Sequence, residues 1–237
     1  RYHASWVPML SADLAVLPAS VMAAADFQAS FYPVASQQLQ VGGRIVGLPL
    51  MYDGLALFYN KDILQTAGVA PPATWAELKQ LASELTVPAD RNERRNGGIQ
   101  RSGLAIGNAT NVDHFADILT LLILQNGGTP AEPSFTQVRD ALLFYTNFVK
   151  EDAIWDSTLP SSTVAFARGE AAMMFAPSWR AHEVLAMNPS LNFGVAQLPQ
   201  LSDDKVAVAN YWAEGVYERS YIKTVAWQFF GYLSSDE

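Results

Sequence analysis

The chain contains no cysteine among its 237 residues. A disulfide framework, a thiolate zinc site and a cysteine nucleophile are therefore excluded. The histidines are only His3, His114 and His182, and none stands in a pattern typical of a zinc hydrolase. No G-x-S-x-G elbow, Walker loop or G-x-G-x-x-G fingerprint occurs. We therefore expect a protein that is not an enzyme, with no catalytic residue, no metal and no cofactor.

Charge and long apolar runs are also scarce. Charged residues make up 16% of the chain, and the net charge is -8. This argues against nucleic-acid binding, because phosphate contacts need clustered Lys and Arg. The one basic cluster, Arg91, Arg94 and Arg95, lies in a polar stretch that predicts a solvated loop. The longest apolar run, at 118–125, is shorter than the roughly 20 residues that span a bilayer and predicts a buried helix.

Half of the residues are apolar, enough for one large domain or two small lobes. Gly42-Gly43 between apolar runs predicts a hairpin, and 54–62 reads as a strand. Thr74 and Glu77 form a capping box before a helical pattern. A helix with Asn111 or Asp113 as its N-cap should end at Gly127-Gly128.

Further elements follow in alternation along the rest of the chain. We expect helices at about 26–32, 135–150, 162–168, 178–187 and 224–235, and strands at 101–108, 171–177, 191–199 and 206–217. Strands that alternate with helices indicate an α/β architecture.

The six tryptophans fall into two groups. Trp75 and Trp227 lie inside amphipathic helical patterns, which predicts that they pack in the core. The other four, Trp6, Trp155, Trp179 and Trp212, stand at polar or proline-flanked junctions. Large aromatics at the ends of elements line cleft mouths, and a flat apolar ring suits the C–H face of a pyranose. Core packing remains the competing interpretation for each of these four.

Four ordered segments carry a family resemblance. They are GRIVGLPLMYDGLALFYNKDILQTAGVAPPATWAEL at 43–78, AFARGEAAMMFAPSW at 165–179, FGVAQLPQ at 193–200 and YWAEGVYERSYIKTVAWQFFGYLSS at 211–235. Together they resemble the family 1 extracellular solute-binding proteins of ABC transporters, the maltose-binding-protein-like group.

The resemblance implies an α/β, two-lobed periplasmic-binding-protein-like fold of type II, truncated at both ends. Residues 1–52 and 209–237 would form a partial N-terminal lobe, and residues 53–208 the C-terminal lobe. An acidic ligand contact falls on Asp53, and the sugar-stacking position on Trp179. The whole set expected to contact ligand is Trp6, Tyr52, Asp53, Asp113, His114, Trp155, Trp179, Arg180, Tyr211, Trp212 and Glu214.

The function implied is capture of a sugar or oligosaccharide in an interlobe cleft by hinge closure, followed by docking on ABC transporter permease subunits. We expect a monomer, extracellular or periplasmic, with a lipid anchor upstream of Arg1 as one arrangement. Two alternatives stay open at this point: a carbohydrate-active enzyme such as a glycosidase, and a surface binding module without a transport role.

Overall fold

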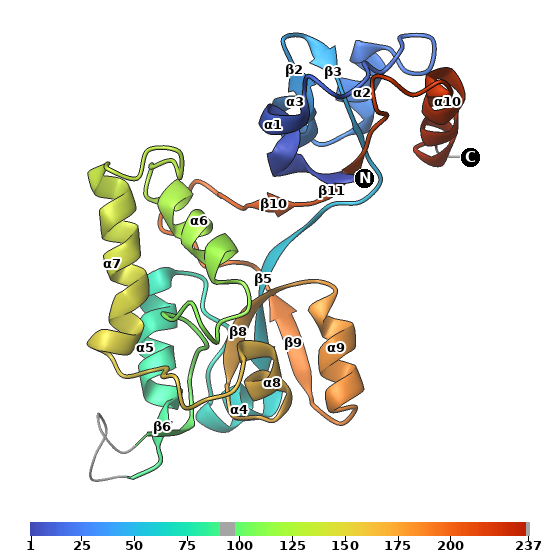
Figure 1. Cartoon of the computed structure of the whole chain (residues 1–237). Helices are drawn as coiled ribbons and strands as arrows, with labels where there is room; N and C mark the ends of the chain where they lie inside the picture. Colours follow the sequence, from blue (N-terminus) through green and yellow to red (C-terminus); the bar gives the residue numbers. More distant parts are fainter. Residues whose placement is uncertain (91–97, 236–237) are drawn as a thin grey trace. The chain divides into compact units, whose positions relative to one another are not determined.

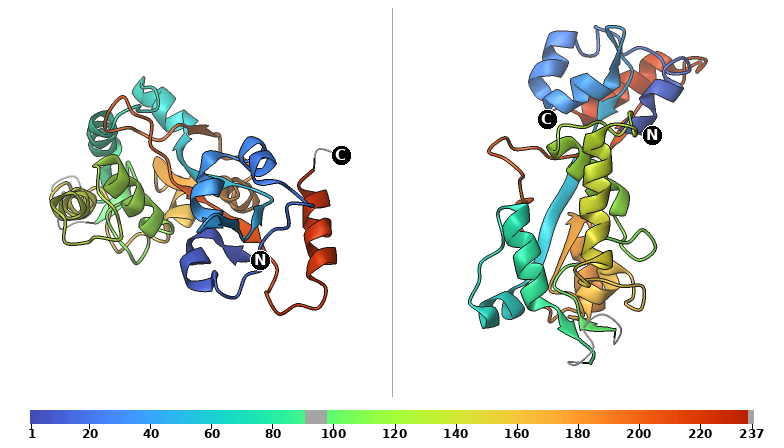
Figure 2. Two further views of the ribbon diagram at one scale, coloured as in Figure 1. Left: turned by 90° about the horizontal axis from the view of Figure 1, so that it is seen from above. Right: turned by 90° about the vertical axis from the view of Figure 1, so that its left-hand side faces the viewer.

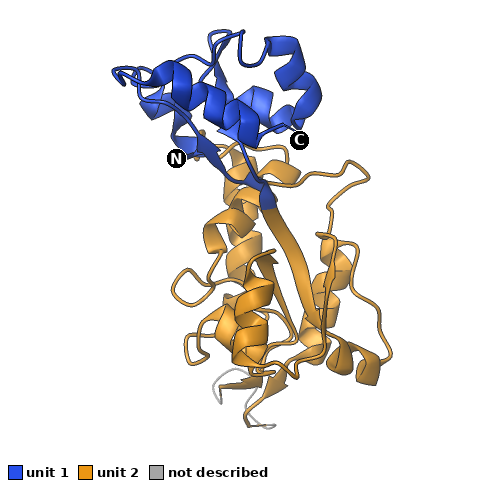
Figure 3. Ribbon diagram, turned by 90° about the vertical axis from the view of Figure 1, so that its right-hand side faces the viewer, with its two compact units in different colours: residues 1–53, 209–237 blue, residues 54–208 orange. Residues whose placement is uncertain are grey.

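The computed structural model describes residues 1–90 and 98–235 (Figure 1). The chain divides into two compact units (Figure 3). Unit 1 comprises Arg1–Asp53 and Ala209–Glu237, and unit 2 comprises Gly54–Val208. Unit 1 is therefore built from two separate stretches of sequence, whereas unit 2 is continuous. The loop expected around Arg91, Arg94 and Arg95 lies outside the described residues.

Unit 1 is organised around a small antiparallel sheet. Its helices are η1 (Ala4–Trp6, 3₁₀), α1 (Val7–Leu10), α2 (Ala24–Ser30), α3 (Pro33–Leu39) and α10 (Lys223–Leu233), and its strands are β1 (Tyr2–His3), β2 (Gln40–Val41), β3 (Arg44–Ile45), β4 (Leu48–Pro49), β10 (Ala209–Asn210) and β11 (Trp212–Glu214). Strand β11 lies between β1 and β4, which joins the two stretches of this unit. Its buried core includes Phe27, Leu39, Leu48 and Trp227.

The hairpin predicted at Gly42-Gly43 is confirmed. It connects β2 to β3, and the two glycines have φ of 56° and 78°. Two consecutive positive φ values are the conformation that a tight two-residue hairpin requires and that glycine adopts at little cost.

Unit 2 places helices on both sides of the antiparallel strands β8, β5 and β9, which belong to a four-stranded sheet completed by β10. Its helices are α4 (Lys61–Ala67), α5 (Trp75–Leu85), α6 (Phe115–Gln125), α7 (Thr136–Lys150), α8 (Ser162–Ala167) and α9 (Arg180–Met187), and its strands are β5 (Asp53–Asn60, whose first residue belongs to unit 1), β6 (Val87–Pro88), β7 (Ile99–Arg101), β8 (Met173–Pro177) and β9 (Phe193–Ala196). Strand β5 pairs with β8 on one edge and β9 on the other. Figures 1 and 2 show α5 and α7 on one side of these strands and α9 on the other.

The central position of β5 explains its sequence. Its neighbouring residues Leu57 and Phe58 are both buried, so both faces of the strand are covered. A strand covered on both faces reads as a continuous apolar run instead of an alternating one. The α/β prediction is therefore confirmed for this unit.

Several helix signals are also confirmed. Thr74 accepts a hydrogen bond from the Glu77 backbone N–H, and the Glu77 carboxylate accepts from the Thr74 backbone N–H, which completes the capping box of α5. Gly127, with φ of 74°, lies just beyond the end of α6. Four apolar residues of α6 are buried, as the run at 118–125 predicts. Among the described residues, no helix combines the length and apolarity needed to cross a membrane.

Two local predictions are wrong. The strand expected at 101–108 ends at Arg101; beyond it, Ser102 and Ala105 make only single bridges to the β8 region. A side chain at Gly103 would overlap the Ala82 carbonyl of α5, so the backbone here packs against a helix. The N-cap of α6 is His114, without a side-chain capping bond, instead of Asn111 or Asp113.

Candidate ligand-binding surfaces

The first candidate surface lies on unit 1 and is formed by Trp6, Trp212 and His3. Strand pairing sets His3 opposite Trp212, and η1 then brings Trp6 beside both. The Trp6 and Trp212 ring centroids are 5.5 Å apart at 78°, and the His3 ring lies 5.6 Å from Trp212. Trp6 is 45% exposed and Trp212 43%. We call this the unit 1 tryptophan surface.

His3 is held in one orientation within this surface. Its Nδ1 accepts a hydrogen bond from the Ser5 backbone N–H at 3.3 Å and lies 2.7 Å from the Ser5 hydroxyl. An accepting Nδ1 leaves the ring proton on Nε2, which donates to Asn210 Oδ1 at 2.9 Å. The ring therefore acts as a fixed support for Trp212.

A tyrosine group lies elsewhere in unit 1. The Tyr52 ring is 5.3 Å from Tyr32 and 4.9 Å from Tyr211. Tyr32 is exposed, Tyr52 is half-buried and Tyr211 is only 2% exposed. Tyr52 and Tyr211, both predicted to contact ligand, thus lie side by side, but Tyr211 packs in the core of the unit.

The Tyr52 and Tyr211 hydroxyls have no hydrogen-bond partner among the described residues. Burial raises the pKa of Tyr52 to about 12 and lifts the pKa of Tyr211 above its ordinary value as well. The nearby Tyr32 backbone lowers the Tyr52 pKa and so cancels part of this rise. It is not positioned to form a hydrogen bond with the Tyr52 hydroxyl.

The two acidic residues predicted in unit 1 stand in different surroundings. Glu214 is 8% exposed, and its Oε1 accepts a hydrogen bond from Arg1 Nε at 2.6 Å. Asp53 is half-buried at the start of β5. The Glu214 carboxylate is therefore already paired within the protein.

The second candidate surface lies on unit 2, around Trp179. Trp179 directly precedes α9 and is 41% exposed, and its ring lies 6.0 Å from the His114 ring in an edge-on arrangement. Arg180 Nε donates to His114 Nε2 at 3.1 Å, and Arg180 Nη1 pairs with Glu183. His114 Nδ1 faces the Asp117 carboxylate at 3.5 Å. We call this the unit 2 tryptophan surface.

Asp113 joins the segment before α6 to the first turn of α8. Its Oδ2 accepts from the Thr163 backbone N–H at 3.0 Å, the Thr163 hydroxyl at 2.5 Å and the Ser162 hydroxyl at 3.1 Å. Burial alone would raise the pKa of the Asp113 carboxyl, but these hydrogen bonds, with the Arg180 charge, outweigh burial and hold that pKa below its usual range. Asp113 Oδ2 is therefore already engaged by hydrogen bonds within the protein.

Trp155 differs from the other junction tryptophans. It is 0% exposed, and its Nε1 donates to Asn111 Oδ1 at 2.8 Å. The Asn111 Nδ2 in turn donates to the Asp156 and Leu159 carbonyls. The structure therefore places Trp155 in the core, with no side-chain surface open to a ligand.

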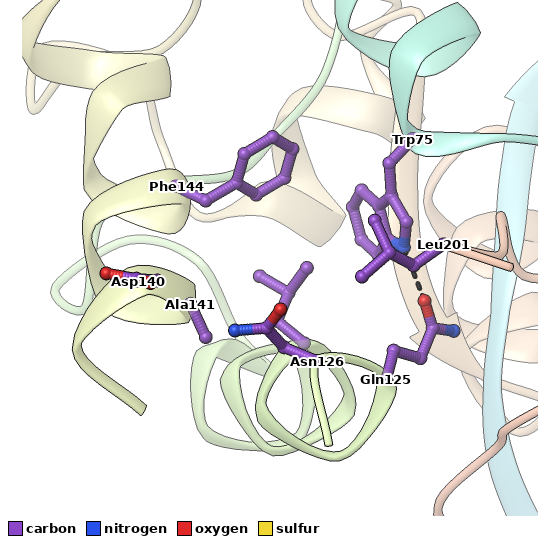
Figure 4. A pocket seen from close by; sticks show the side chains of 8 residues that line it. Trp75, Gln125, Asn126, Asp140, Ala141, Phe144 and Leu201 are labelled. Carbon is purple, nitrogen blue, oxygen red and sulfur yellow. Dashed lines mark hydrogen bonds between the residues drawn. The ribbon is translucent and has the colours of Figure 1, made fainter. Parts of the chain in front are cut away.

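The hollow shown in Figure 4 does not involve any of the predicted site residues. It has a volume of about 130 Å³ and is lined by Trp75, Leu122, Gln125, Asn126, Asp140, Ala141, Phe144 and Leu201. Trp75 is 3% exposed and donates to Gln125 Oε1 at 2.6 Å. The core roles predicted for Trp75 and for Trp227, which is 1% exposed, are confirmed. Among the described residues, no group of three or more His, Asp or Glu side chains is arranged to hold a metal ion.

Sequence reasoning missed several participants: His3, Tyr32, Asp117 and Glu183. Two of them carried a usable signal, because His114–Asp117 and Arg180–Glu183 are i,i+3 pairs at helix starts. His3 and Tyr32 reach their partners through strand pairing and loop packing, which the spacing of residues in the sequence does not predict.

Comparison with known proteins gives a consistent family assignment. Residues 5–237 match the family described as bacterial extracellular solute-binding protein. A binding protein of Brucella abortus (strain 2308) is 24% identical over 189 residues, which cover 73% of this chain and 42% of that relative.

Two solved structures show the same fold. The sugar-binding protein MalE from Xanthomonas citri has 22% identity and a TM-score of 0.74, over 99% of this chain and 60% of its own. An ABC transporter solute-binding protein from Thermotoga lettingae TMO has 23% identity and a TM-score of 0.73, over 97% of this chain and 60% of its own. The chain thus spans well under two thirds of the length of these relatives. The match over nearly all of the sequence shows that the chain belongs to the bacterial extracellular solute-binding protein family.

Proposed function

We propose that this chain captures a sugar or oligosaccharide as the solute-binding component of an ABC importer. The observation that carries the proposal is the pair of exposed tryptophan surfaces, one on each unit. Trp6, Trp179 and Trp212 each leave more than two fifths of their surface open to solvent. An exposed indole is costly in water, and its flat face suits the C–H face of a pyranose ring.

Polar groups beside these rings support a ligand rich in hydroxyls. His114 and Arg180 lie beside Trp179. Asn210 is hydrogen-bonded to His3, whose ring contacts Trp212. Amide, imidazole and guanidinium groups donate and accept the hydrogen bonds that fix a sugar's orientation.

Relatives support the same ligand class. The Thermotoga lettingae protein was solved with bound alpha-D-tagatose, and the Xanthomonas citri protein is described as sugar-binding. We carry this class over to the present chain as a proposal, together with ABC transporter permease subunits as partners and an extracellular or periplasmic location.

The mechanism we propose is capture without chemistry. Unit 1 and unit 2 act as the two lobes, and sugar binding favours a closed state. Asp113 and Glu214, two of the carboxylates predicted to contact ligand, are already engaged by the fold.

The test is calorimetry of the 237-residue chain against a panel of neutral mono- and oligosaccharides, with Trp179→Ala beside the parent. We expect the variant to lose at least about tenfold in affinity while its melting temperature stays close to that of the parent. Phe135→Ala is the matched control, because Phe135 is a 47% exposed aromatic residue of unit 2 outside the surface.

Unchanged affinity in Trp179→Ala would overturn the assignment of this surface. A panel in which no sugar binds, or in which a sugar is hydrolysed, would overturn the proposed function. A ligand that binds only the folded chain also raises its melting temperature, which gives an independent readout.

A further inference from the structure

The unit 2 tryptophan surface carries an excess of negative charge. Arg180 supplies the one guanidinium of this group: it pairs with Glu183 on α9 and acts electrostatically on Asp113 before α6, while Asp117 on α6 faces His114. Three carboxylates against one guanidinium leave an excess of two negative charges beside the exposed Trp179 ring.

Arg180 is itself occupied by protein groups. Its Nε donates to His114 and its Nη1 pairs with Glu183. Its charge also acts on Asp113 and contributes to holding the pKa of that carboxyl below its usual range. A ligand carboxylate or phosphate would have to displace Glu183 from the guanidinium and then lie close to the remaining carboxylates.

We propose that this surface selects sugars by charge: it rejects rings that carry a carboxylate or phosphate and favours rings that carry an ammonium group. The inference rests on the proposed function, because it names the ligand class of the same surface. An amino group on a sugar stacked at Trp179 would be attracted by the net negative charge of this group. A uronate at the same place would meet repulsion that the paired Arg180 does not relieve.

The size of the effect follows from Coulomb's law at a partly exposed site. Two net charges several ångströms from a ligand charge, at an effective dielectric between that of protein and water, change affinity on the order of tenfold in either direction. The discrimination should shrink at high salt, because mobile ions screen partly exposed charges.

The experiment uses matched sugars and matched variants. Glucose, galactose and mannose are each titrated into the chain by calorimetry beside their 2-amino-2-deoxy and uronate forms, at about pH 6.5, where an amine of ordinary pKa is protonated. We expect affinity to fall in the order amino, neutral, uronate.

Glu183→Gln removes one carboxylate and releases Arg180 from its partner, so we expect it to reduce this ordering by several-fold and to improve uronate binding. Glu84→Gln is the control, because it makes the same change in net charge on α5, where the Glu84 carboxylate accepts a hydrogen bond from the Gln80 amide. The control should keep the ordering of the parent chain.

Uronates that bind as well as the neutral sugars, or an ordering that Glu183→Gln leaves intact, would overturn charge selection. Neutral sugars would still bind in that case, so the proposed function would stand. If no sugar of any charge binds, both proposals fail together.

Discussion

The Asp113 carboxylate caps a helix that lies 49 residues further along the chain. Its Oδ2 accepts from the Thr163 hydroxyl at 2.5 Å and the Thr163 backbone N–H at 3.0 Å, at the start of α8. The local N-cap residue of α8, Ser161, makes no side-chain capping bond. Asp113 thus supplies from a distance the cap that a helix usually takes from its own sequence. The next residue, His114, has its ring 6.0 Å from that of Trp179.

Replacing Asp113 with Asn should lower the free energy of unfolding by about 1–2 kcal/mol at neutral pH, because charged acceptors make stronger hydrogen bonds than amides. The folded pKa of Asp113 is depressed, so its extra stability is present above the unfolded pKa of about 3.9 and is lost as pH falls through the folded pKa. Denaturant titrations of parent and variant should therefore converge below about pH 4. Asp140→Asn, at an exposed carboxylate on α7, serves as the control and should change little. A constant gap at all pH values would contradict the charged cap.

Trp6 and Trp212 should act as one unit in sugar binding. Their rings contact each other edge to face, so removal of either loosens the other. In a double-mutant cycle on sugar affinity, Trp6→Ala and Trp212→Ala should show a coupling of about 0.5–1.5 kcal/mol. The control cycle pairs Trp6 with Phe229, an exposed aromatic residue whose ring contact is with Phe230. Strict additivity in the tryptophan cycle would argue against a shared surface.

Two tyrosines of unit 1 should respond in opposite ways to loss of the hydroxyl group. The Tyr2 hydroxyl donates to the buried Val46 carbonyl at 2.9 Å, so Tyr2→Phe should cost about 1–3 kcal/mol of stability. The Tyr52 hydroxyl has no partner among the described residues, so Tyr52→Phe should be neutral or stabilising near pH 7. Chemical denaturation of both variants gives the comparison, and an equal loss in the two would contradict it.

Alkaline pH should destabilise the chain partly through Tyr52. Burial raises its folded pKa to about 12, whereas an unfolded tyrosine titrates near 10. A raised folded pKa means that the contribution is fully present below pH of about 10 and is lost as pH rises toward 12. Melting temperatures measured across this range should fall less steeply for Tyr52→Phe than for the parent. Identical slopes would show that Tyr52 ionises as freely in the folded chain as in the unfolded one.

Trp155 should contribute to the stability of the protein and not to ligand binding. Its burial and its bond to Asn111 predict that Trp155→Ala costs about 3–5 kcal/mol. The gentler Trp155→Phe keeps most of the apolar volume and should leave sugar affinity within about twofold of the parent. Calorimetry and denaturation on the same preparation separate the two effects, and a large loss of affinity in a stable Trp155→Phe would restore this residue to the ligand set.

Short-range signals in the sequence were sufficient for much of the fold. The capping box at Thr74 and the glycine pair at 42–43 each satisfy backbone groups within a few residues, so their spacing carries the information. Trp155 and Trp179 could not be told apart in this way, because both follow polar or proline-flanked junctions. What separates them is the Asn111 side chain, which lies 44 residues before Trp155 in sequence. The role of Asp113 was missed for the same reason, since its partners belong to a distant helix.

The discontinuity of unit 1 has a consequence for how the protein is made. Arg1 and Glu214 form an ion pair although they are 213 positions apart in the sequence. All of unit 2 lies between the paired strands β1 and β11 in the sequence. On the ribosome, unit 2 can complete its core while β11 is still untranslated, because every segment it needs is contiguous. Until β11 is translated, Tyr2 and its neighbours in the first stretch of unit 1 stay exposed. Pairing residues 1–53 with residues 209–237 then closes a very long loop. The unit 1 tryptophan surface can therefore form only after all of unit 2 has been translated.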